Sequence, residues 1–465
     1  MEPSVPTRRR RIGILLICSL SLFIVGLDIT VVNVALPSIG RDLGAGISGL
    51  QWTVDAYTVV LASLLMFSGS MGDRLGRKGV FIAGLGVFSA ASVLCSLAPT
   101  VELLVAARVL QAVGASMLNP VAMSIVTNTF TDPRERAQAV GVWGAVFGVS
   151  MALGPIVGGT VVSAIGWRAI FWVNLPIGLA AIALTLRFIP QSRAPRARRF
   201  DPVGQILVIV LLATLTAGII EEMVSLFVVA AAALIGLLAY EPRREEPLID
   251  LRFFRSIPFA SAIVISVAAF AAFGGFLFLN TLYLQEARGL SPVQAGLATV
   301  PLALMTVFAS PLSGRIVGRR GPRLPLVIAG VGLIVATVML AGLEATTPIA
   351  WLLAAYVVFG LGFGFVNAPI TNAAVSGMPR AQAGVAAALA TTSRQVGQAL
   401  GVAVVGAIVS SHAATGLSSA SHPVWWTLAG CGGLVLVLGL MATARRATES
   451  ARRTAAALNP EALVA

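Results

Sequence analysis

Residues 12–37 read IGILLICSLSLFIVGLDITVVNVALP and contain one charged side chain, Asp28. A helix needs about 20 mainly apolar residues to cross the roughly 30 Å hydrocarbon core of a bilayer. The stretch is too long for a cleaved signal peptide and has no small-x-small cleavage site. It therefore predicts a transmembrane helix that remains in the mature protein.

Similar apolar runs recur along the whole chain. Fourteen of them cover residues 12–37, 51–71, 79–98, 103–128, 138–163, 170–189, 203–220, 224–240, 257–283, 293–314, 324–343, 350–376, 383–411 and 424–444. Of the 465 residues, 57% are hydrophobic and 11% are charged, whereas soluble proteins contain roughly 25% charged residues. Because too few polar side chains remain to cover a soluble surface, we predict an all-α membrane protein with 14 transmembrane helices.

The basic residues indicate which loops face the cytoplasm. Of 32 basic residues, 27 lie in the N-terminal segment, in alternate loops or in the C-terminal tail. The loops on the opposite side contain only Arg41, Arg168 and Arg288. Positive charge accumulates on the cytoplasmic side of membrane proteins. We therefore expect a multi-pass protein of the cytoplasmic membrane with both termini in the cytoplasm.

The fourteen runs form a six-plus-two-plus-six arrangement. We expect an N-terminal six-helix lobe at residues 12–189, cytoplasmic linkers with two extra transmembrane helices at 190–256, a C-terminal six-helix lobe at 257–444, and a cytoplasmic tail at 445–465. The lobes also contain related loops, GSMGDRLGRK at residues 69–78 and GRIVGRRG at residues 314–321. Paired repeats are typical of transporters whose two halves rock about a central site.

Several motifs resemble a known family. Residues 69–78 match the G-x-x-x-D-R-x-G-R-K cytoplasmic loop of the major facilitator superfamily. The stretches LDITVVNVALP (27–37), GPIVGG (154–159) and WRAIFWVNLPIG (167–178) resemble the fourteen-span drug:proton antiporter family 2. WTVDAY (52–57) and YLQEARG (283–289) are similar to methylenomycin A resistance protein-like exporters. The resemblance covers nearly the whole chain and implies the major facilitator fold.

The resemblance also implies a role for the first loop, which latches the lobes on the inner side in this superfamily. The residues that match this cytoplasmic gate loop are Gly69, Asp73, Arg74, Gly76, Arg77 and Lys78. We expect the Asp73 carboxylate to accept hydrogen bonds from NH groups at a helix N-terminus. The second loop has Gly318 at the place of Asp73 and so lacks this carboxylate.

Three ionisable residues in the first lobe are candidates for proton coupling. Asp28 lies roughly 24 Å from the inner end of its helix, and Asp55 lies roughly 7 Å from the outer end of the next. Intramembrane charges are rare, and functional by default. Arg108 could bond either acid and release it when substrate or a proton arrives. The alternatives are that Asp55 reaches the outer interface or is bonded to neighbours, and that Arg108 forms a permanent buried ion pair.

Further polar residues are candidates for lining a substrate cavity. They are Asp28, Asn33, Gln111, Arg394 and Gln398. Gln111 follows Arg108 by three residues and so shares its helix face. Arg394 would place a cation in the second lobe, where it could meet substrate carbonyls or an acid. We expect neutral or zwitterionic amphiphiles to be carried at least as well as permanent cations.

The fifth run carries small residues on one helical face. This candidate hinge motif comprises Gly148, Gly154, Pro155, Gly158 and Gly159. Small residues let helix backbones approach closely in lipid, and the proline bends its helix because it lacks a backbone donor. We expect a close-packed hinge between the lobes, and in the resembled family this motif marks antiporters. A purely structural packing face is the alternative.

Other classes of site are not expected. Residues 44–49 match G-x-G-x-x-G but follow no strand, so they do not indicate a dinucleotide site. The sequence has no Walker motif and no H-E-x-x-H, and Cys18, Cys95 and Cys431 lie in separate apolar runs. We expect no cofactor and no metal. The arginines are explained by topology, so no nucleic-acid partner is expected.

Together, these features favour proton-coupled efflux of small lipophilic drugs or antibiotics by alternating access. The expected partners are the substrate, protons and the lipid bilayer, and the protein is expected to be a monomer and not an enzyme. One alternative is a solute-specific major facilitator transporter, exporter or importer, that does not act on drugs. A remote alternative is a polytopic membrane enzyme or sensor, which should contain a catalytic pair or a sizeable soluble domain.

Overall fold

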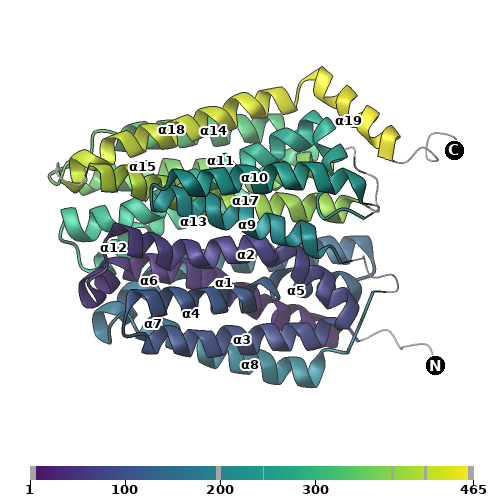
Figure 1. Cartoon of the computed structure of the whole chain (residues 1–465), viewed down its shortest axis with the longest axis horizontal. Coiled ribbons are helices and arrows are strands. Elements are labelled where there is room, and N and C mark those ends of the chain that lie inside the picture. The colour runs from purple at the N-terminus through teal and green to yellow at the C-terminus, as the bar shows by residue number, and fades with distance from the viewer. Residues whose placement is uncertain are drawn as a thin grey trace. The chain divides into compact units, whose positions relative to one another are not determined.

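The computed structural model describes residues 7–194, 200–244, 246–376, 378, 382–412 and 416–458, and nearly all of them are helical (Figure 1). Within these residues there is no strand. The linker residues Arg196, Arg198 and Arg199, and Arg380 in a later loop, lie outside the described part of the chain. Their expected places on the cytoplasmic side are therefore not described.

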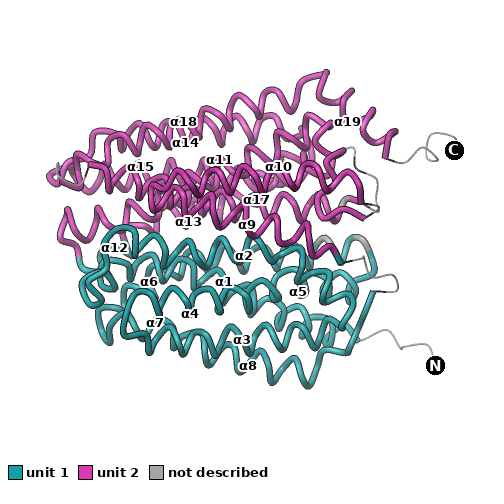
Figure 2. Tube along the Cα trace, in the orientation of Figure 1, with its two compact units in different colours: residues 1–200, 291–297 teal, residues 201–290, 298–465 magenta. Residues whose placement is uncertain are grey.

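The chain forms two compact units, which Figure 2 shows in different colours. Unit 1 ends at Phe200 and also includes Ser291–Leu297. Its helices are α1 (Arg8–Leu43), α2 (Ile47–Leu75), α3 (Arg77–Leu97), α4 (Val101–Ser116), α5 (Asn119–Thr129), α6 (Pro133–Ala164), α7 (Ala169–Trp172), α8 (Asn174–Phe188) and most of α12 (Pro292–Ala298).

Unit 2 contains the remaining described residues. Its α-helices are α9 (Pro202–Ile220), α10 (Val224–Tyr240), α11 (Ile257–Leu282), α13 (Val300–Arg320), α14 (Arg323–Leu340), α15 (Ile349–Gly364), α16 (Asn367–Val375), α17 (Ala383–Ser411), α18 (Leu417–Ala442) and α19 (Arg445–Leu458). Short helical turns are η1 (Glu241–Arg243), η2 (Leu251–Arg255) and η3 (Tyr283–Ala287).

The prediction of an all-α membrane protein is confirmed. Thirteen of the helical segments in the described residues are long and apolar enough to cross a membrane. The remaining predicted span is α17, a helix of 29 residues that is not among the thirteen. Its first half contains the polar run TTSRQ at residues 391–395, which lowers its apolar character. This is also where the candidate residue Arg394 lies.

Four predicted spans are each divided into two helices in the described residues, and the fourth and the twelfth are divided at equivalent places. The fourth run forms α4 and α5, with Asn119 and Pro120 opening α5, and the twelfth forms α15 and α16, with Asn367 opening α16 and Pro369 in its first turn. Proline suits the first turn of a helix, where its missing N–H would have no partner within the helix. In the sequence, each of these two breaks is therefore marked by a proline in the first turn of the second helix.

The two units repeat the same packing. In unit 1, α1 packs against α6 and α8, and α3 packs against α4 and α8. In unit 2, α11 packs against α17 and α18, and α14 packs against α15 and α18. Each of these four pairs in unit 1 thus has a counterpart in unit 2. This repetition agrees with the internal repeat indicated by the two related loops.

The three arginines expected on the sparsely charged side all have partners. Arg41 donates to the Ser38 hydroxyl at 3.2 Å. Arg168 pairs with Asp42 and also donates to the Ala98 carbonyl at 3.2 Å, and Arg288 donates to the Thr347 carbonyl. Arg168 and Arg288 thus connect segments far apart in the sequence, whereas Arg41 bonds within its own helix.

Candidate functional site

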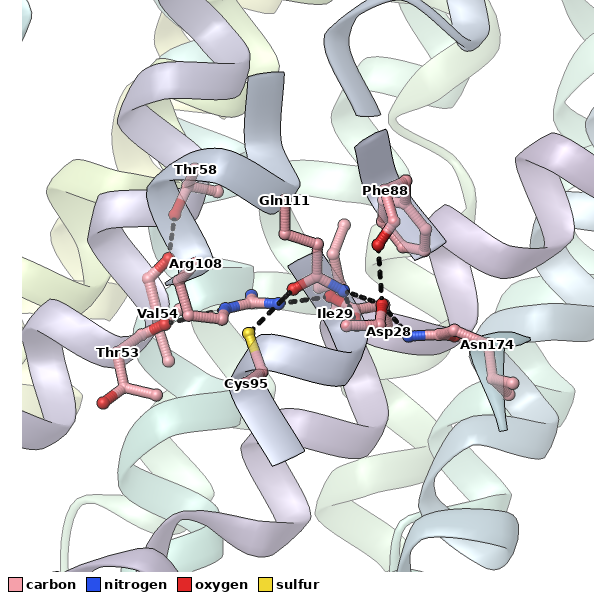
Figure 3. Close-up of polar contacts among 12 residues, drawn as sticks. Asp28, Ile29, Thr53, Val54, Thr58, Phe88, Cys95, Arg108, Gln111 and Asn174 are labelled. Atoms are coloured by element: carbon pink, nitrogen blue, oxygen red, sulfur yellow. Dashed lines mark hydrogen bonds and ion pairs between the residues drawn. The ribbon is translucent and has the colours of Figure 1, made fainter. Parts of the chain in front are cut away.

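A buried ion pair lies in the interior of unit 1. Asp28 comes from the middle of α1 and Arg108 from α4, and Figure 3 shows their side chains meeting between the helices. The Arg108 Nη1 atom is 2.5 Å from Asp28 Oδ2, and each side chain is only 1% exposed. Of the two acids that Arg108 could bond, the structure selects Asp28.

Asp28 has two further hydrogen-bond donors. Gln111 Nε2 and Asn174 Nδ2 both donate to Asp28 Oδ1, at 2.8 and 3.0 Å. The carboxylate thus receives hydrogen bonds from α4 and from α8, as well as the charge of Arg108. A buried charge is tolerated when it is paired and hydrogen-bonded, and Asp28 meets both conditions.

Arg108 is also held by α2. Its Nε donates to the Thr53 carbonyl at 3.1 Å, and its guanidinium carbon lies 4.1 Å from the centre of the Tyr57 ring. Its Nη1 also donates to a second acceptor, Gln111 Oε1, at 2.6 Å. Arg108 therefore connects α1, α2 and α4 through one side chain.

Two small residues of α3 complete the network. Ser92 Oγ accepts from Gln111 at 2.9 Å and from Asn174 at 3.3 Å, and donates to the Phe88 carbonyl at 2.9 Å. Cys95 Sγ donates to Gln111 Oε1 at 3.7 Å. The sequence reading did not assign a role to Asn174, Ser92 or Cys95. Asn174 could have been noticed, because it lies inside one of the quoted family motifs.

Asp55 is buried apart from this network. It is 0% exposed, and neither of its carboxyl oxygens has a hydrogen-bond partner among the described residues. The nearby Thr58 hydroxyl donates instead to the Val54 carbonyl at 2.7 Å. Asp55 is two residues from both Thr53 and Tyr57, and a step of two residues turns a helix by about 200°. Asp55 therefore lies on the face of α2 directed away from Arg108.

The other candidate cavity residues are divided between the units. Asn33 is buried in α1, where its Nδ2 donates to the Ile29 carbonyl at 2.8 Å and takes no part in the Asp28 network. Arg394 and Gln398 belong to α17 of unit 2. Gln398 is 5% exposed, and its backbone closely approaches Gly274 of α11. The structure thus brings Gln111 to Asp28 but leaves Asn33 separate.

The gate loop corrects one expectation. The Asp73 carboxylate accepts from the Arg77 side chain, at 3.0 Å from Nε and 2.7 Å from Nη2, rather than from NH groups at a helix N-terminus. The reason is the spacing of four residues, which places both side chains on one side of the turn. Gly76 between them has φ 111°, a conformation that favours glycine.

The same loop holds the chain that leaves α8. The Arg77 amide donates to the Ser192 carbonyl at 2.9 Å, and the Ala194 amide donates to the Asp73 carbonyl at 3.1 Å. Lys78 Nζ donates to the Leu186 carbonyl at 2.8 Å. Residues 69–78 therefore organise the first part of the linker as well as their own turn.

We expect Asp73→Ala to slow the conformational cycle while leaving substrate affinity within a few-fold. The substitution frees Arg77 and loosens the turn, but Asp73 lies in the last turn of α2, where its carboxylate bonds Arg77 and none of the candidate cavity residues. Transport rate and equilibrium binding measured on the same preparation test this prediction. Asp250→Ala is the matched control, because Asp250 also pairs with a nearby arginine, Arg252 at 2.8 Å. A large loss of affinity with an unchanged rate would instead place Asp73 in the binding site.

In the candidate hinge motif, the glycines from Gly154 onward pack closely against neighbouring helices. A Cβ on Gly154 would overlap the Thr30 side chain, and one on Gly158 would lie 3.1 Å from Val31 Cα. On another side, a Cβ on Gly159 would lie 2.5 Å from the Pro292 carbonyl oxygen. The glycines therefore allow both α1 and the start of α12 to contact α6.

Other residues of α6 differ in how closely they pack. The carbonyl of Pro155 lies against Gly296 of α12. Earlier in α6, Gly148 is partly exposed, and a Cβ on Gly144 would meet no atom within 4 Å. Close approach of a neighbouring backbone or side chain is thus observed at Gly154, Gly158 and Gly159 but not at Gly144.

We expect Gly158→Val to destabilise the protein and to abolish transport, because the Val31 backbone cannot move aside. Overpacking costs about 1–3 kcal/mol. Gly144→Val, in open space on the same helix, is the matched control and should retain transport. Thermal unfolding and uptake by membrane vesicles measure the two effects. Equal tolerance of both substitutions would show that close packing by Gly158 is not required.

No metal centre is evident where the structure describes the chain. In that part, no three His, Cys, Asp or Glu side chains are grouped so as to hold a metal ion.

Comparisons with known proteins identify the family. The model of the Major Facilitator Superfamily matches residues 18–402. Multidrug resistance protein Stp of Mycobacterium tuberculosis (strain ATCC 25618 / H37Rv) is 34% identical over 87% of this chain and 76% of its own length. The tetracenomycin C resistance and export protein of Streptomyces glaucescens is 36% identical, over 88% of this chain and 78% of its own length.

A further relative matches the predicted resemblance directly. The methylenomycin A resistance protein of Streptomyces coelicolor (strain ATCC BAA-471 / A3(2) / M145) is 36% identical over 83% of each chain. This confirms the resemblance inferred from the motifs.

Solved structures agree on the fold. A bacterial homologue of the human lysosomal transporter Spinster has a TM-score of 0.68 at 18% identity, over 97% of this chain and 98% of that one. The peptide transporter POT in complex with sulfate has a TM-score of 0.69 at 16% identity, over 94% and 95% of the two chains. The family model covers more than half of the chain and the curated relatives exceed 30% identity. The chain belongs to the major facilitator superfamily.

Proposed function

We propose that the protein is a proton-driven exporter of small lipophilic drugs or antibiotics, which works by alternating access across the cell membrane. The relatives named for drug and antibiotic resistance support this choice of substrate class. The observation that carries the coupling is the pair of buried acids in unit 1. One of them, Asp28, has a cationic partner, and the other, Asp55, has none among the residues that the structure describes.

The two acids are proposed to have different roles. To take up a proton on Oδ2, Asp28 would have to give up its ion pair with Arg108. Asp55 has no such partners to give up, and a buried charge without a partner is costly. Asp55 is therefore the acid that we assign to proton transfer, while Asp28 keeps its ion pair with Arg108 in this conformation.

The Asp28 network is proposed to respond to the same cycle. Arg108 contacts α2 on both sides of Asp55 in sequence, at Thr53 and Tyr57. A movement of α2 that exposes Asp55 to water would also alter the contacts of Arg108. Asp28 then becomes available to bind a proton or a substrate group, which couples the two acids without a shared hydrogen bond.

The proposal also covers the topology, the moving lobes and the oligomeric state. Both termini are placed in the cytoplasm, as the distribution of arginines indicates. The six-helix lobes at residues 12–189 and 257–444 are the moving parts, and residues 190–256 connect them. The protein works as a monomer and performs transport without covalent chemistry.

Drug susceptibility tests the proposed function. Expression in an efflux-deficient bacterial host should raise resistance to several lipophilic antibiotics, and an uncoupler that collapses the proton gradient should remove the protection from active efflux. A proton gradient of 100 mV is worth about 2.3 kcal/mol for one charge, or roughly fifty-fold accumulation. The control is the empty vector with the same uncoupler. Unchanged susceptibility to a broad panel, or efflux indifferent to the uncoupler, would contradict the proposal.

A further inference from the structure

Arg394 is a cation in unit 2, and no described residue of the unit forms an ion pair with it. It lies eleven residues into α17, roughly 17 Å along the helix, and its side chain is partly buried. Its Nη2 donates to the Thr371 hydroxyl of α16 at 2.6 Å. Among the described residues it forms no ion pair with any carboxylate.

Acidic residues are rare in this lobe. Residues 257–444 contain two acidic residues, Glu286 and Glu344. Glu286 lies in η3 after α11, and Glu344 lies between α14 and α15. Neither belongs to α16 or α17, the two helices that Arg394 joins. The two acids of residues 257–444 are therefore on other elements than the two helices that Arg394 joins.

The polar pair at the equivalent place of unit 2 is neutral. Tyr356 of α15 donates to Asn280 of α11. The corresponding helices of unit 1, α4 and α1, contribute the ion pair of Arg108 and Asp28. The repeat thus replaces an ion pair with a phenol and an amide. Arg394 is on a different helix from both groups, so this pair does not compensate its charge.

Several polar atoms beside Arg394 also lack partners. Arg394 Nε, Gln395 Oε1 and Thr392 Oγ1 are buried and have no hydrogen-bond partner among the described residues. Arginine has five N–H donors, and the hydroxyl of Thr371 is the acceptor that the structure provides for them. Since unmade buried hydrogen bonds are costly, the cluster is suited to a ligand that brings acceptors with it.

The surroundings of this cluster are aromatic on one side and polar on the other. The Arg394 guanidinium carbon lies 5.9 Å from the centre of the Phe270 ring. Phe270 contacts Phe363 at 5.2 Å, and Phe363 stacks on Phe273 at 4.2 Å between ring centres. Thr371 on the other side is exposed. Low polarity near the cation strengthens its attraction for an anion.

We propose that Arg394 binds the acidic oxygen atoms of planar aromatic acids, so that such acids are a substrate class of this transporter. The inference rests on the proposed function as an exporter. A carboxylate matches the guanidinium with two parallel hydrogen bonds, and the aromatic part of the ligand suits the phenylalanine surroundings. A neutral carbonyl would form weaker bonds with the same donors.

Binding of a matched pair of probes tests the inference. The probes are 2-naphthoate and 2-naphthamide, which have the same ring system and nearly the same shape but differ in charge. The purified full-length protein in lipid nanodiscs should bind the acid about tenfold to hundredfold more tightly, as expected for a hydrogen-bonded charge. Arg394→Gln should remove this preference while binding of the amide stays within about twofold.

Two further variants make the comparison specific. Arg255→Gln is the matched control, because Arg255 is an exposed arginine of η2 outside the membrane spans, and it should leave the preference unchanged. Arg394→Lys keeps the charge but not the planar fork, and it should retain part of the preference. If Arg394→Gln does not fold, Arg394→Lys and the wild-type comparison of acid with amide decide the matter.

The outcomes separate this inference from the proposed function. Equal binding of acid and amide by the wild-type protein would overturn the inference, and so would a preference for the acid that survives Arg394→Gln. Transport of a quaternary ammonium dye in the same experiments would then show that the export function remains. Conversely, if binding of the acid depends on Arg394 but no probe is transported in exchange for protons, the inference holds and the proposed function fails.

Discussion

The Asp55→Asn protein is expected to bind substrate but not to accumulate it against a gradient. Asparagine is nearly the same size as aspartic acid and resembles its protonated form, so the buried site beside Thr58 should remain packed. It cannot release a proton. Energised uptake into inverted vesicles should therefore fall to the level of passive entry, a loss of the roughly fifty-fold accumulation that one coupled charge provides at 100 mV.

The controls for this substitution distinguish a proton carrier from a packing residue. Asp55→Glu retains an ionisable carboxyl group and should recover part of the uphill transport. Exchange of labelled for unlabelled substrate, which needs no net proton movement, should continue in the Asp55→Asn protein. Full accumulation by Asp55→Asn would show that the proton is carried elsewhere.

Asp28→Asn is expected to damage both stability and transport. It leaves Arg108 buried without its ionic partner, and breaking a buried ion pair by removing one side costs about 3–5 kcal/mol. The remaining contacts of Arg108, with Thr53, Gln111 and Tyr57, are polar but uncharged. Thermal unfolding should show the loss of stability, and energised uptake should show the loss of transport.

A neutral double variant separates the two effects. Asp28→Asn combined with Arg108→Gln removes both charges, and so should recover much of the stability that the single variant loses. Transport should stay low if the charges work in the cycle. Recovery of transport together with stability would mean that Asp28 and Arg108 form a permanent structural pair.

Much of the fold could be predicted because the membrane makes polar residues conspicuous. Each of the fourteen apolar runs is helical in the described residues, since a backbone in lipid must satisfy its own hydrogen bonds. The breaks at Pro120 and Pro369 were missed, because a run counted by apolar content alone appears continuous across a proline. The packing of residues 291–297 with unit 1 also has no local signal in the sequence.

The candidate site was predictable in part for the same reason. Asp28 and Arg108 stand out as charges within apolar runs, and Gln111 follows from its spacing of three residues. Ser92 and Cys95 do not stand out, since small polar residues occur in many membrane helices and often bond their own backbone. The separation of Asp55 from Arg108 depends on how α2 is rotated, which the sequence does not reveal.

Substrate-driven proton release tests the central claim most directly. Purified protein is placed in a weakly buffered solution with a pH indicator, and a transported antibiotic is added without any membrane gradient. The account predicts that the wild-type protein releases protons in proportion to the substrate bound, and that Asp55→Asn binds the same substrate with no comparable release. Binding without proton release by the wild-type protein, or equal release by a correctly folded Asp55→Asn protein, would contradict it.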